Sequence, residues 1–456
     1  MKISVIGCGY LGAVHAAGMA SLGHEVVGVD VDEAKVAALS EGVAPFHEPG
    51  FPELLSEQVA AGRLRFTTDM AAVAEAQVHF IGVGTPQQKG SHAADLQYVN
   101  ATVSELCPHL RDGALVVGKS TVPVGTARRL RSEIQAAQPS AELIWNPEFL
   151  REGFAIKDTL TPDRIVYGVS EQALHEEGAS LKSVVLLDEV YQSIIELPTQ
   201  RLIVGLETAE LVKVAANAFL ATKISFINAM AEICESTGGD VTELADAIGL
   251  DERIGRRYLN SGLGFGGGCL PKDIRAFQAR AEELGRAEPL RFLAEVDAIN
   301  TRRRERVVEL VAELTNRTLE ENSQPLAGVT VALWGLAFKP NSDDIRDLPA
   351  LDVARRLLEA GAYVQAHDPQ AMQNAQRQLP RLATCPTPLE ATRNADILIL
   401  GTEWNVYRDA NPAQVKTLIG SPRLIDGRNY LDRSMWAHAG WVVRCLGRPD
   451  LTFDQL

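Results

Sequence analysis

ISVIGCGYLG, residues 3–12, decides the fold class of this chain. Its first four residues are mostly β-branched and predict a short strand, which runs directly into a glycine-rich turn. An alanine-rich helical segment and a second β-rich run over residues 25–30 follow. This order predicts a βαβ unit. A glycine turn at the start of its helix is typical of a site for the pyrophosphate of a dinucleotide.

The G-x-G-x-x-G spacing gains weight from its context, because a lone glycine pattern is common. Asp30 ends the second predicted strand, where a carboxylate can accept hydrogen bonds from the ribose of NAD and repel the 2′-phosphate of NADP. The alternative is a tight turn with an acidic residue on the surface. We therefore expect NAD as the cofactor. The residues of this unit predicted to bind it are Gly7, Gly9, Tyr10, Leu11, Gly12 and Asp30, with Lys35 near the adenosine.

The length of 456 residues is too great for one ordinary core, so we expect several domains. Strand candidates at residues 79–83, 115–119 and 143–145 extend the first unit into a doubly wound parallel sheet. Residues 199–235 form a long alanine-rich helical stretch that ends at Gly238 and Gly239. Such a helix is long enough to join two domains and to offer a face for dimerisation.

A second α/β region follows a linker at residues 315–328. Its strand candidates lie at residues 329–334, 363–367, 397–400, 424–425 and 441–445, with a helical stretch at 351–360. We predict the α/β class, with two Rossmann-like doubly wound parallel-sheet domains joined by a helical central domain. The predicted boundaries are 1–198 for the NAD-binding domain, 199–314 for the central domain that carries Cys269, and 315–456 for the C-terminal domain.

The net charge of −15 and the pI near 5.2 repel nucleic acid and anionic membrane surfaces, so neither is an expected partner. A phosphate-bearing substrate must therefore be held by local donors. The six cysteines include no C-x-x-C pair and have no matching His cluster, so we expect no metal site and a reducing compartment, the cytoplasm. We also expect no apolar run long enough to span a membrane.

GFGGGCLPKD, residues 264–273, is the most unusual string in the chain. Its glycines predict a loop that wraps a ligand with backbone N–H groups. Pro271 suits the first turn of a helix, which places the Cys269 thiol at a positive helix end where the thiolate forms more easily. Asp273, one turn on, can reach back toward the sulfur. The alternative is an inert, buried cysteine.

Lys213 and Asn217 are four residues apart on the long helix and share one face. Their neighbours are mostly apolar, so this lysine needs a partner or a function, although such a pair is usually solvated. A fixed cation beside a reactive thiol can stabilise a developing oxyanion.

Two further motifs follow predicted strand ends of the first sheet, where open α/β sheets bind ligands. STVPVGT covers residues 120–126 and NPEFLREG covers residues 146–153. Glu148 and Glu152 are four residues apart, which would place them on one face if the segment is helical, and such a pair can move protons. The alternatives are an ordinary turn and a solvated acidic face.

Read together, the motifs of this chain resemble those of the nucleotide-sugar dehydrogenases that make uronic acids, the UDP-glucose/GDP-mannose dehydrogenase family, and most of all its bacterial UDP-glucose-oxidising members. The resemblance covers nearly the whole chain. The matching motifs are GCGYLG, EPG (48–50), GTP (84–86), STVPVGT, NPEFLREG, the Lys213/Asn217 helix, GFGGGCLPKD, GLAFKPNSDDIRD (335–347), DP (368–369), TEW (402–404) and DGRN (426–429).

The resemblance implies oxidation of UDP-glucose to UDP-glucuronate by two NAD, through a thiohemiacetal and a thioester on Cys269. It implies a C-terminal domain that binds UDP, and a homodimer or higher homo-oligomer in which Arg253 reaches the partner's site. Glu148 is implied as the base for thioester hydrolysis. The implied catalytic set is Cys269, Lys213, Asp273, Asn217, Thr121 and Glu148. The implied further NAD contacts are Thr85, Ser120, Thr121, Glu152 and Arg346. The implied substrate contacts are Glu148, Phe149, Leu150, Glu152, Lys213, Asn217, Arg253, Phe265, Gly266, Gly267, Lys339 and Arg428.

Two alternatives stay open at this point. The substrate can be GDP-mannose or a UDP-N-acetylhexosamine, because the same four-electron chemistry serves all of them. The chain can also be an inactive nucleotide-sugar-binding protein, since folds outlive activities. Three positions depart from the family pattern: Gly268 stands where many members have Ser, Asn260 where some have Lys, and Asp347-Leu348 where Glu-Ser is common. Asn260 bears on how the substrate is held.

Overall fold

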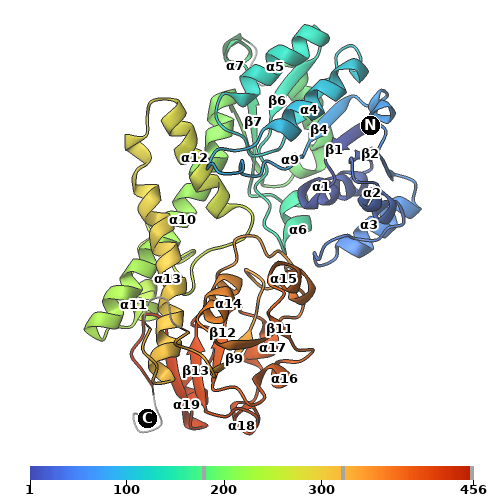
Figure 1. Ribbon diagram of the computed structural model, residues 1–456. Helices are drawn as coiled ribbons and strands as arrows, with labels where there is room; N and C mark the ends of the chain where they lie inside the picture. Colours follow the sequence, from blue (N-terminus) through green and yellow to red (C-terminus); the bar gives the residue numbers. More distant parts are fainter. Residues whose placement is uncertain (177–180, 320–323, 452–456) are drawn as a thin grey trace. The chain divides into compact units, whose positions relative to one another are not determined.

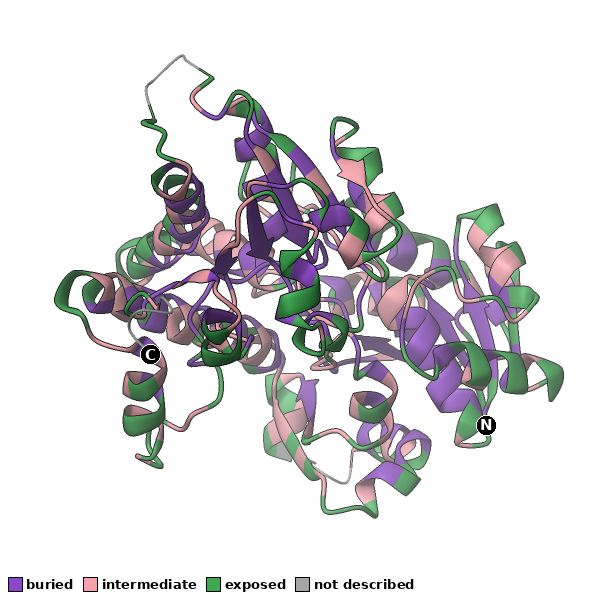
Figure 2. Ribbon diagram, turned by 90° about the horizontal axis from the view of Figure 1, so that it is seen from below, coloured by how far each residue is buried: buried purple, intermediate pink, exposed green. Residues whose placement is uncertain are grey.

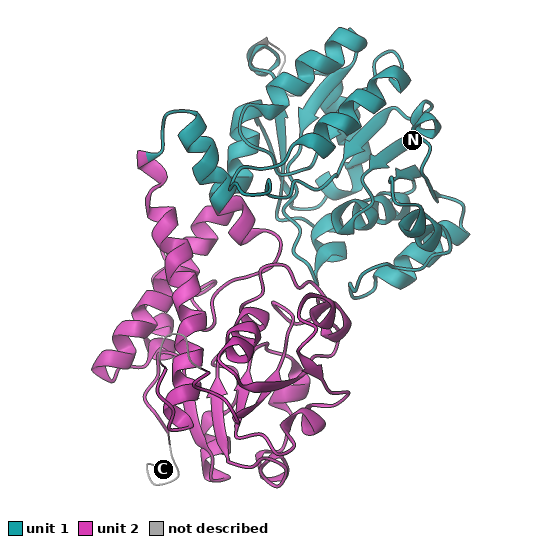
Figure 3. Ribbon diagram, in the orientation of Figure 1, with its two compact units in different colours: residues 1–216, 275–287 teal, residues 217–274, 288–456 magenta. Residues whose placement is uncertain are grey.

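The computed structural model describes residues 1–176, 181–319 and 324–451, and the chain divides into two compact units (Figure 3). Unit 1 contains Met1–Ala216 and Arg275–Ala287, and unit 2 contains Asn217–Ile274 and Glu288–Leu456. Each unit has its own sheet, whose strands are mostly buried (Figure 2). Both units are discontinuous in sequence, and the three-domain boundaries expected from the sequence stay predictions.

In the described part of unit 1, eight strands form one sheet in the order β3-β2-β1-β4-β5-β6-β7-β8. The strands β1 to β6 are parallel to their neighbours, β7 pairs antiparallel with β6, and β8 pairs parallel with β7. Val, Ile and Leu fill the inner strands, as a sheet covered on both faces requires. The strands are β1 (Lys2–Ile6), β2 (Glu25–Val29), β3 (Leu64–Thr67), β4 (Val78–Ile81), β5 (Leu115–Gly118), β6 (Glu142–Trp145), β7 (Arg164–Val169) and β8 (Gln200–Gly205).

The helices of unit 1 connect these strands (Figure 1). They are α1 (Tyr10–Ser21), α2 (Glu33–Ser40), α3 (Phe51–Ala60), α4 (Gln97–Leu106), α5 (Thr126–Ala137), α6 (Ala155–Leu160), α7 (Glu171–Glu176), α8 (Lys182–Val190) and α9 (Gln192–Ile195), with short 3-10 helices at Met70–Val73 and Cys107–His109. The predicted βαβ unit is confirmed as β1, α1 and β2, with the glycine turn between β1 and α1.

The long helix α10 (Leu206–Thr237) has its first residues in unit 1 and the remainder in unit 2. It ends before Gly238, which has a φ of 77° and closes the helix as predicted. The expected start near residue 199 is wrong, because residues Gln200–Gly205 form β8. Their Leu-Ile-Val run pairs with β7, and this long-range pairing overrides the helical pattern that follows it.

Among the described helices, α10 alone is long and apolar enough to cross a membrane. By length and composition, the expectation that no apolar run has this length is therefore wrong. Core helices of soluble proteins share this length and composition, so α10 is weak evidence for a membrane span.

In the described part of unit 2, six strands form a parallel sheet in the order β11-β10-β9-β12-β13-β14. Trp334, Trp436 and Trp441 are fully buried in its core. The strands are β9 (Thr330–Trp334), β10 (Tyr363–His367), β11 (Ala383–Thr384), β12 (Ile397–Leu400), β13 (Arg423–Asp426) and β14 (Val442–Cys445). The second predicted parallel sheet is therefore confirmed, including all five strands that the sequence indicated.

Unit 2 also contains helices, among which α13 packs against α14 and β13. They are α11 (Val241–Gly249), α13 (Phe292–Leu314), α14 (Pro349–Glu359), α15 (Met372–Gln378), α16 (Pro388–Thr392), α17 (Asn405–Arg408), α18 (Pro412–Lys416) and α19 (Arg433–His438), with a 3-10 helix at Glu288–Leu290. Helix α12 (Leu270–Glu283) begins in unit 2 and continues in unit 1.

Candidate active site

The glycine turn after β1 has the shape that a pyrophosphate site needs. Gly7 has a φ of 90°, and a Cβ at Gly12 would lie 1.8 Å from the carbonyl oxygen of Gly7, so both positions require glycine. A Cβ at Gly9 would meet no atom within 4 Å, which leaves open space above the turn. The residues present therefore fit a dinucleotide whose phosphates approach the start of α1.

Asp30 lies directly after β2 and is almost completely buried. Its carboxylate accepts a 2.8 Å hydrogen bond from the backbone N–H of Cys8 in the glycine turn. Lys35 places its Nζ 2.9 Å from both carboxylate oxygens. The predicted neighbours are thus brought together, and the carboxylate is fixed between the turn and a cation.

The loop after β5 carries Ser120 and Thr121 and contacts the loop after β4. The hydroxyl of Ser120 donates to the carbonyl of Val83 at 2.7 Å, and the hydroxyl of Thr85 donates to the carbonyl of Thr121 at 2.7 Å. These three predicted residues therefore lie together at the carboxyl ends of parallel strands, where open sheets bind ligands.

Glu210 on α10 holds the end of the same loop, and sequence reasoning missed it. Its carboxylate accepts 2.7 Å hydrogen bonds from the N–H groups of Gly125 and Ala127, at the start of α5. Arg280 adds a 3.0 Å hydrogen bond to the carbonyl of Val124. Burial raises the pKa of Glu210 to about 7, although the two N–H donors oppose this shift. The only sequence signal was its place one turn before Lys213 on an apolar helix.

Residues 146–150 follow β6 in an extended loop, and residues 152–153 form a turn before α6. The expected helical face shared by Glu148 and Glu152 is therefore wrong, because Pro147 and Gly153 interrupt the segment. Glu148 accepts hydrogen bonds from the N–H groups of Phe149 and Leu150 at 2.8 and 3.0 Å. Its second oxygen lies 3.0 Å from Nζ of Lys119, a buried residue that sequence reasoning also missed.

Phe149 and Lys213, both predicted site residues of unit 1, lie next to each other. The Nζ of Lys213 lies 5.6 Å from the centre of the Phe149 ring, and the guanidinium of Arg164 lies 4.1 Å from it. Aromatic faces attract cations, so Phe149 helps to fix the lysine. Leu150 packs against the core of the unit.

Glu48, in the EPG motif, joins the glycine turn to the loop that carries Glu148 and Glu152. This buried carboxylate accepts hydrogen bonds from the N–H groups of Gly153 at 2.6 Å and Ala155 at 2.7 Å. The hydroxyl of Tyr10 donates to the same carboxylate. The EPG string was the sequence signal for Glu48, but its backbone partners Gly153 and Ala155 are about a hundred residues away in the chain.

In unit 2, Cys269 is exposed and stands immediately before α12, which confirms the predicted helix start. The N–H of Asp273 donates to the carbonyl of Cys269 at 2.9 Å. The Asp273 carboxylate is buried and accepts 2.6 Å hydrogen bonds from the side chains of Asn217 and Lys272. Three of the predicted catalytic residues therefore lie in one group on α10 and α12.

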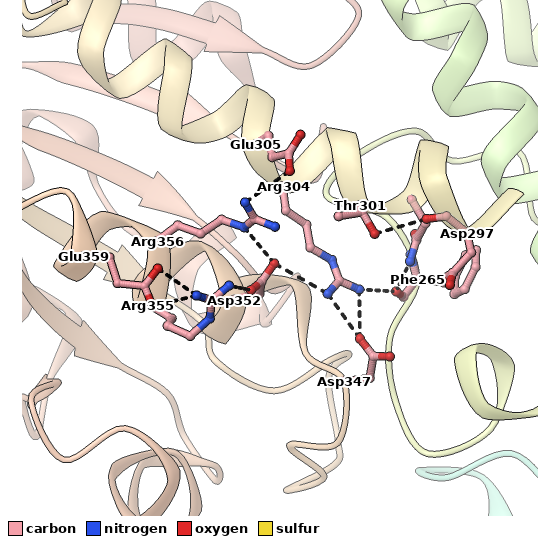
Figure 4. Close-up of polar contacts among 11 residues, drawn as sticks. Phe265, Asp297, Thr301, Arg304, Glu305, Asp347, Asp352, Arg355, Arg356 and Glu359 are labelled. Atoms are coloured by element: carbon pink, nitrogen blue, oxygen red, sulfur yellow. Dashed lines mark hydrogen bonds and ion pairs between the residues drawn. The ribbon is translucent and has the colours of Figure 1, made fainter. Parts of the chain in front are cut away.

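The glycine loop before Cys269 is held by two residues of α13, four positions apart. Asn300 accepts from the N–H of Phe265 at 2.7 Å and donates to its carbonyl at 3.0 Å. Arg304 donates to the same carbonyl at 3.2 Å and lies 3.1 Å from the carboxylate of Asp347, and Figure 4 shows both contacts. Arg304 also lies 3.7 Å from Asp352 on α14. The loop is thus part of a charged network that fixes its shape.

Two other N–H groups of this loop also have partners within unit 2. Gly267 donates to the carbonyl of Arg346 at 2.9 Å, and Gly268 donates to the carboxylate of Asp344 at 3.3 Å. A Cβ at Gly268 would lie 2.1 Å from the guanidinium carbon of Arg346. The glycine that departs from the family pattern therefore makes room for Arg346. A ligand that binds the N–H groups of Phe265 and Gly267 must share them with their present acceptors, the side chain of Asn300 and the carbonyl of Arg346.

Arg428 and Lys339 lie in unit 2. Arg428 donates to the carbonyl of Gly401 at 2.8 Å and to that of Gly264 at 3.1 Å, so it joins the end of β12 to the glycine loop. The Nζ of Lys339 lies 4.8 Å from the centre of the Phe338 ring. Arg253 is well exposed and pairs with Asp251.

The predicted residues form two groups, one in each unit. Unit 1 holds the glycine turn, Asp30, Lys35, Thr85, Ser120, Thr121, Glu148, Phe149, Leu150, Glu152 and Lys213. Unit 2 holds Asn217, Arg253, Phe265, Gly266, Gly267, Cys269, Asp273, Lys339, Arg346 and Arg428. Within the described ranges, no group of three or more His, Cys, Asp or Glu residues could hold a metal ion.

Three models of one protein family match this chain. The NAD binding domain of the UDP-glucose/GDP-mannose dehydrogenase family matches residues 1–195, the central domain matches residues 207–302, and the UDP binding domain matches residues 332–433. UDP-glucose 6-dehydrogenase of Rhizobium meliloti (strain 1021) is 40% identical over 453 residues, which cover 99% of this chain and 100% of that protein.

Solved structures give the same result. A UDP-glucose dehydrogenase from the hyperthermophilic archaeon Pyrobaculum islandicum matches with a TM-score of 0.86 and 36% identity, over 98% of both chains. A UDP-D-ManNAc dehydrogenase from Pyrococcus horikoshii matches with a TM-score of 0.82 and 25% identity, over 98% of this chain and 99% of that chain.

Proposed function

The chain belongs to the UDP-glucose/GDP-mannose dehydrogenase family of NAD-dependent enzymes, and we propose that it oxidises UDP-glucose to UDP-glucuronate. The observation that carries the choice of substrate is 40% identity along the whole chain to an enzyme named for UDP-glucose. The identity to the UDP-D-ManNAc dehydrogenase is 25%.

The residues of unit 1 support NAD as the cofactor. The open space at Gly9 and the close approach of Gly7 and Gly12 fit the pyrophosphate, and Asp30 with Lys35 fits the adenosine ribose. When bound, NAD supplies the acceptor for the hydride in each of the two oxidations.

Cys269 supplies the nucleophile in this proposal. The sulfur adds to C6 of the aldehyde formed by the first oxidation, and the thiol proton goes to the aldehyde oxygen, which gives a thiohemiacetal. The second oxidation leaves a thioester on Cys269. Its exposed position before α12 and the neighbouring Asp273 and Asn217 support this role.

Hydrolysis then releases the product. Water attacks the thioester carbon, Glu148 takes the water proton, the C–S bond breaks, and the departing sulfur takes the proton of the carboxylic acid. Lys213, fixed by Phe149, would stabilise the oxyanion of the tetrahedral intermediate. In sum, the alcohol, two NAD⁺ and one water give the carboxylate, two NADH and three protons.

We propose a homodimer formed through α10. Phe219, Phe226 and Ile233 lie seven residues apart on that helix and are 66%, 49% and 57% exposed. Residues at this spacing share one face, and a row of exposed large apolar side chains indicates an interface. Arg253 would reach the partner's site from the same unit.

The six cysteines, all free within the described residues, support a reducing compartment, for which we propose the cytoplasm.

The test is NADH formation by the purified protein with UDP-glucose, GDP-mannose and two UDP-N-acetylhexosamines. We expect kcat/KM for UDP-glucose to exceed the others by about tenfold or more, because a sugar pocket rejects substrates that leave its polar groups unpaired. If kcat/KM is highest for another of these nucleotide sugars, that sugar replaces UDP-glucose as the proposed substrate. Absence of NADH with every sugar would favour the inactive binding protein.

A further inference from the structure

Lys119 is a buried lysine that the proposed mechanism has not yet used. It follows β5 directly, and its side chain is 5% exposed. A buried ammonium group is costly unless it is paired and fully hydrogen-bonded, so its partners deserve an explanation.

The Lys119 ammonium donates two hydrogen bonds and forms one ion pair. Its Nζ lies 3.0 Å from Oε2 of Glu148, 3.0 Å from Oδ1 of Asn146 and 3.3 Å from the hydroxyl of Tyr191. Tyr191 in turn donates to Oδ1 of Asn146 at 2.9 Å. The amide of Asn146 is fixed by its 3.0 Å hydrogen bond to the carbonyl of Val166. The lysine therefore has one defined position.

Two titratable neighbours of Lys119 are neutral. Burial lowers the pKa of His15 well below its usual value, and Lys119 lowers it further, so the imidazole stays neutral. Burial raises the pKa of Tyr191, and Glu148 raises it further, so the hydroxyl keeps its proton. The other cations near this loop, Arg164 and Lys213, face the ring of Phe149.

The hydrogen bonds of Glu148 leave its second oxygen able to accept from a further donor. A carboxylate has about four lone-pair positions, two on each oxygen. Oε1 accepts from the N–H groups of Phe149 and Leu150, which fills its two positions. Oε2 forms the 3.0 Å ion pair with Lys119, so the carboxylate is held at both oxygens.

We infer that Lys119 is the positioning residue for thioester hydrolysis: its ion pair holds the Glu148 carboxylate in place and leaves a lone pair of Oε2 to accept the proton of the attacking water. The inference rests on the proposed function, in which Glu148 is the base. Lys119 itself does not touch the reacting atoms. Its loss should slow the hydrolysis step, while both oxidations continue.

The test is Lys119→Met, which keeps most of the length of the side chain and removes the cation. We expect the steady rate at pH 7 to fall about tenfold or more, because the base is no longer held in place. Intact-protein mass spectrometry of enzyme quenched during turnover with UDP-glucose and NAD should show the thioester on most molecules, since hydrolysis is slowed and oxidation is not. Lys119→Arg, which keeps a cation, should restore the steady rate and remove the accumulated thioester in large part.

Two further variants make each outcome decisive. Lys119→Gln can still donate to Asn146 and Tyr191, so it replaces Lys119→Met if that variant does not fold. Glu148→Gln tests the proposed function itself, because it should accumulate the thioester at every pH. If Glu148→Gln accumulates no thioester, Glu148 is not the base and the proposed function is wrong at that step. If Glu148→Gln accumulates it but the neutral Lys119 variant keeps the wild-type rate and shows no thioester, the inference about Lys119 alone is overturned.

Discussion

The carboxylate of Glu210 accepts a 2.7 Å hydrogen bond from the backbone N–H of Ala127, in the first turn of α5. A carboxylate at this end of a helix is normally favourable, because the N–H groups and the helix dipole stabilise its charge. Here desolvation outweighs these donors and raises the pKa to about 7. Glu210 therefore changes its charge in the pH range where the protein is expected to work.

This pKa predicts a pH-dependent contribution to stability. The folded protein binds the proton of Glu210 more tightly than the unfolded chain, in which the carboxyl has its ordinary pKa of about 4.5. The resulting stability is full below pH 4.5 and is lost as the pH rises through about 7. The loss is about 3 kcal/mol, at about 1.4 kcal/mol for each pKa unit.

Glu210→Gln cannot ionise, so it should gain stability relative to wild type by about 3 kcal/mol between pH 4 and pH 8. Urea unfolding at several pH values measures this difference. Glu207→Gln, one turn earlier on α10 and partly exposed, is the matched control and should show no change of that size. A constant difference between wild type and Glu210→Gln across this pH range would mean that Glu210 does not titrate as described.

Asp30 and Lys35 predict the choice of cofactor. The carboxylate of Asp30 should disfavour NADP, because it repels the 2′-phosphate and loses a hydrogen bond to the ribose. We expect wild-type kcat/KM for NAD to exceed that for NADP by about a hundredfold or more. Asp30→Ala should reduce this ratio, since Lys35 then loses its 2.9 Å ion pair and can bind the phosphate.

The double variant Asp30→Ala, Lys35→Ala is the control for this prediction. It should bind NADP more weakly than Asp30→Ala alone. Equal kcat/KM values for the two cofactors in the wild-type enzyme would show that Asp30 does not select the cofactor.

The sequence predicted most of the fold because its inner strands are distinctive. Residues 3–6, 363–367 and 397–400 are short buried runs bounded by turn residues, and the structure has strands at all three places. β8 was missed because its Leu-Ile-Val run passes into the helical pattern of α10 without a turn of several residues between them. Its partner, β7, lies about forty residues earlier in the chain, and pairing at that distance leaves no local signal.

At the site, too, the sequence indicated residues that lie in local motifs but not contacts between residues that are far apart in the chain. Local motifs indicated Asp30, Cys269 and Asp273, because glycine turns and a helix start surround them. The pair of Lys119 and Glu148 joins the ends of two adjacent strands, and neither position has a periodic pattern that reveals the other. The spacing of Glu148 and Glu152 suggested a helix, but Pro147 and Gly153 exclude it from this segment.

The exposed face of α10 predicts how the enzyme assembles. Phe226→Asp places a charge in the middle of the row formed by Phe219, Phe226 and Ile233, and burial of an unpaired charge in an interface is costly. We expect analytical ultracentrifugation to show a dimer for wild type and mostly monomer for Phe226→Asp. Lys416→Asp, which changes charge on α18, is the control and should remain dimeric. A wild-type protein that sediments as a monomer would contradict the interface.

The central claim is that Cys269 carries the sugar through a second oxidation. Cys269→Ala should still bind NAD and UDP-glucose, because neither ligand depends on the sulfur for affinity, but its steady turnover should be lost. Cys269→Ser can add an oxygen to the aldehyde and form an ester that hydrolyses more slowly than a thioester. Intact-protein mass spectrometry should then show the sugar bound to the enzyme.

The most direct measurement is the number of NADH molecules formed for each UDP-glucose consumed by the wild-type enzyme, with the sugar product identified by mass spectrometry. Two oxidations through a covalent intermediate predict a ratio of two and UDP-glucuronate as the product. A ratio of one, with free aldehyde as the product, would contradict the thioester and remove Cys269 from the centre of the mechanism.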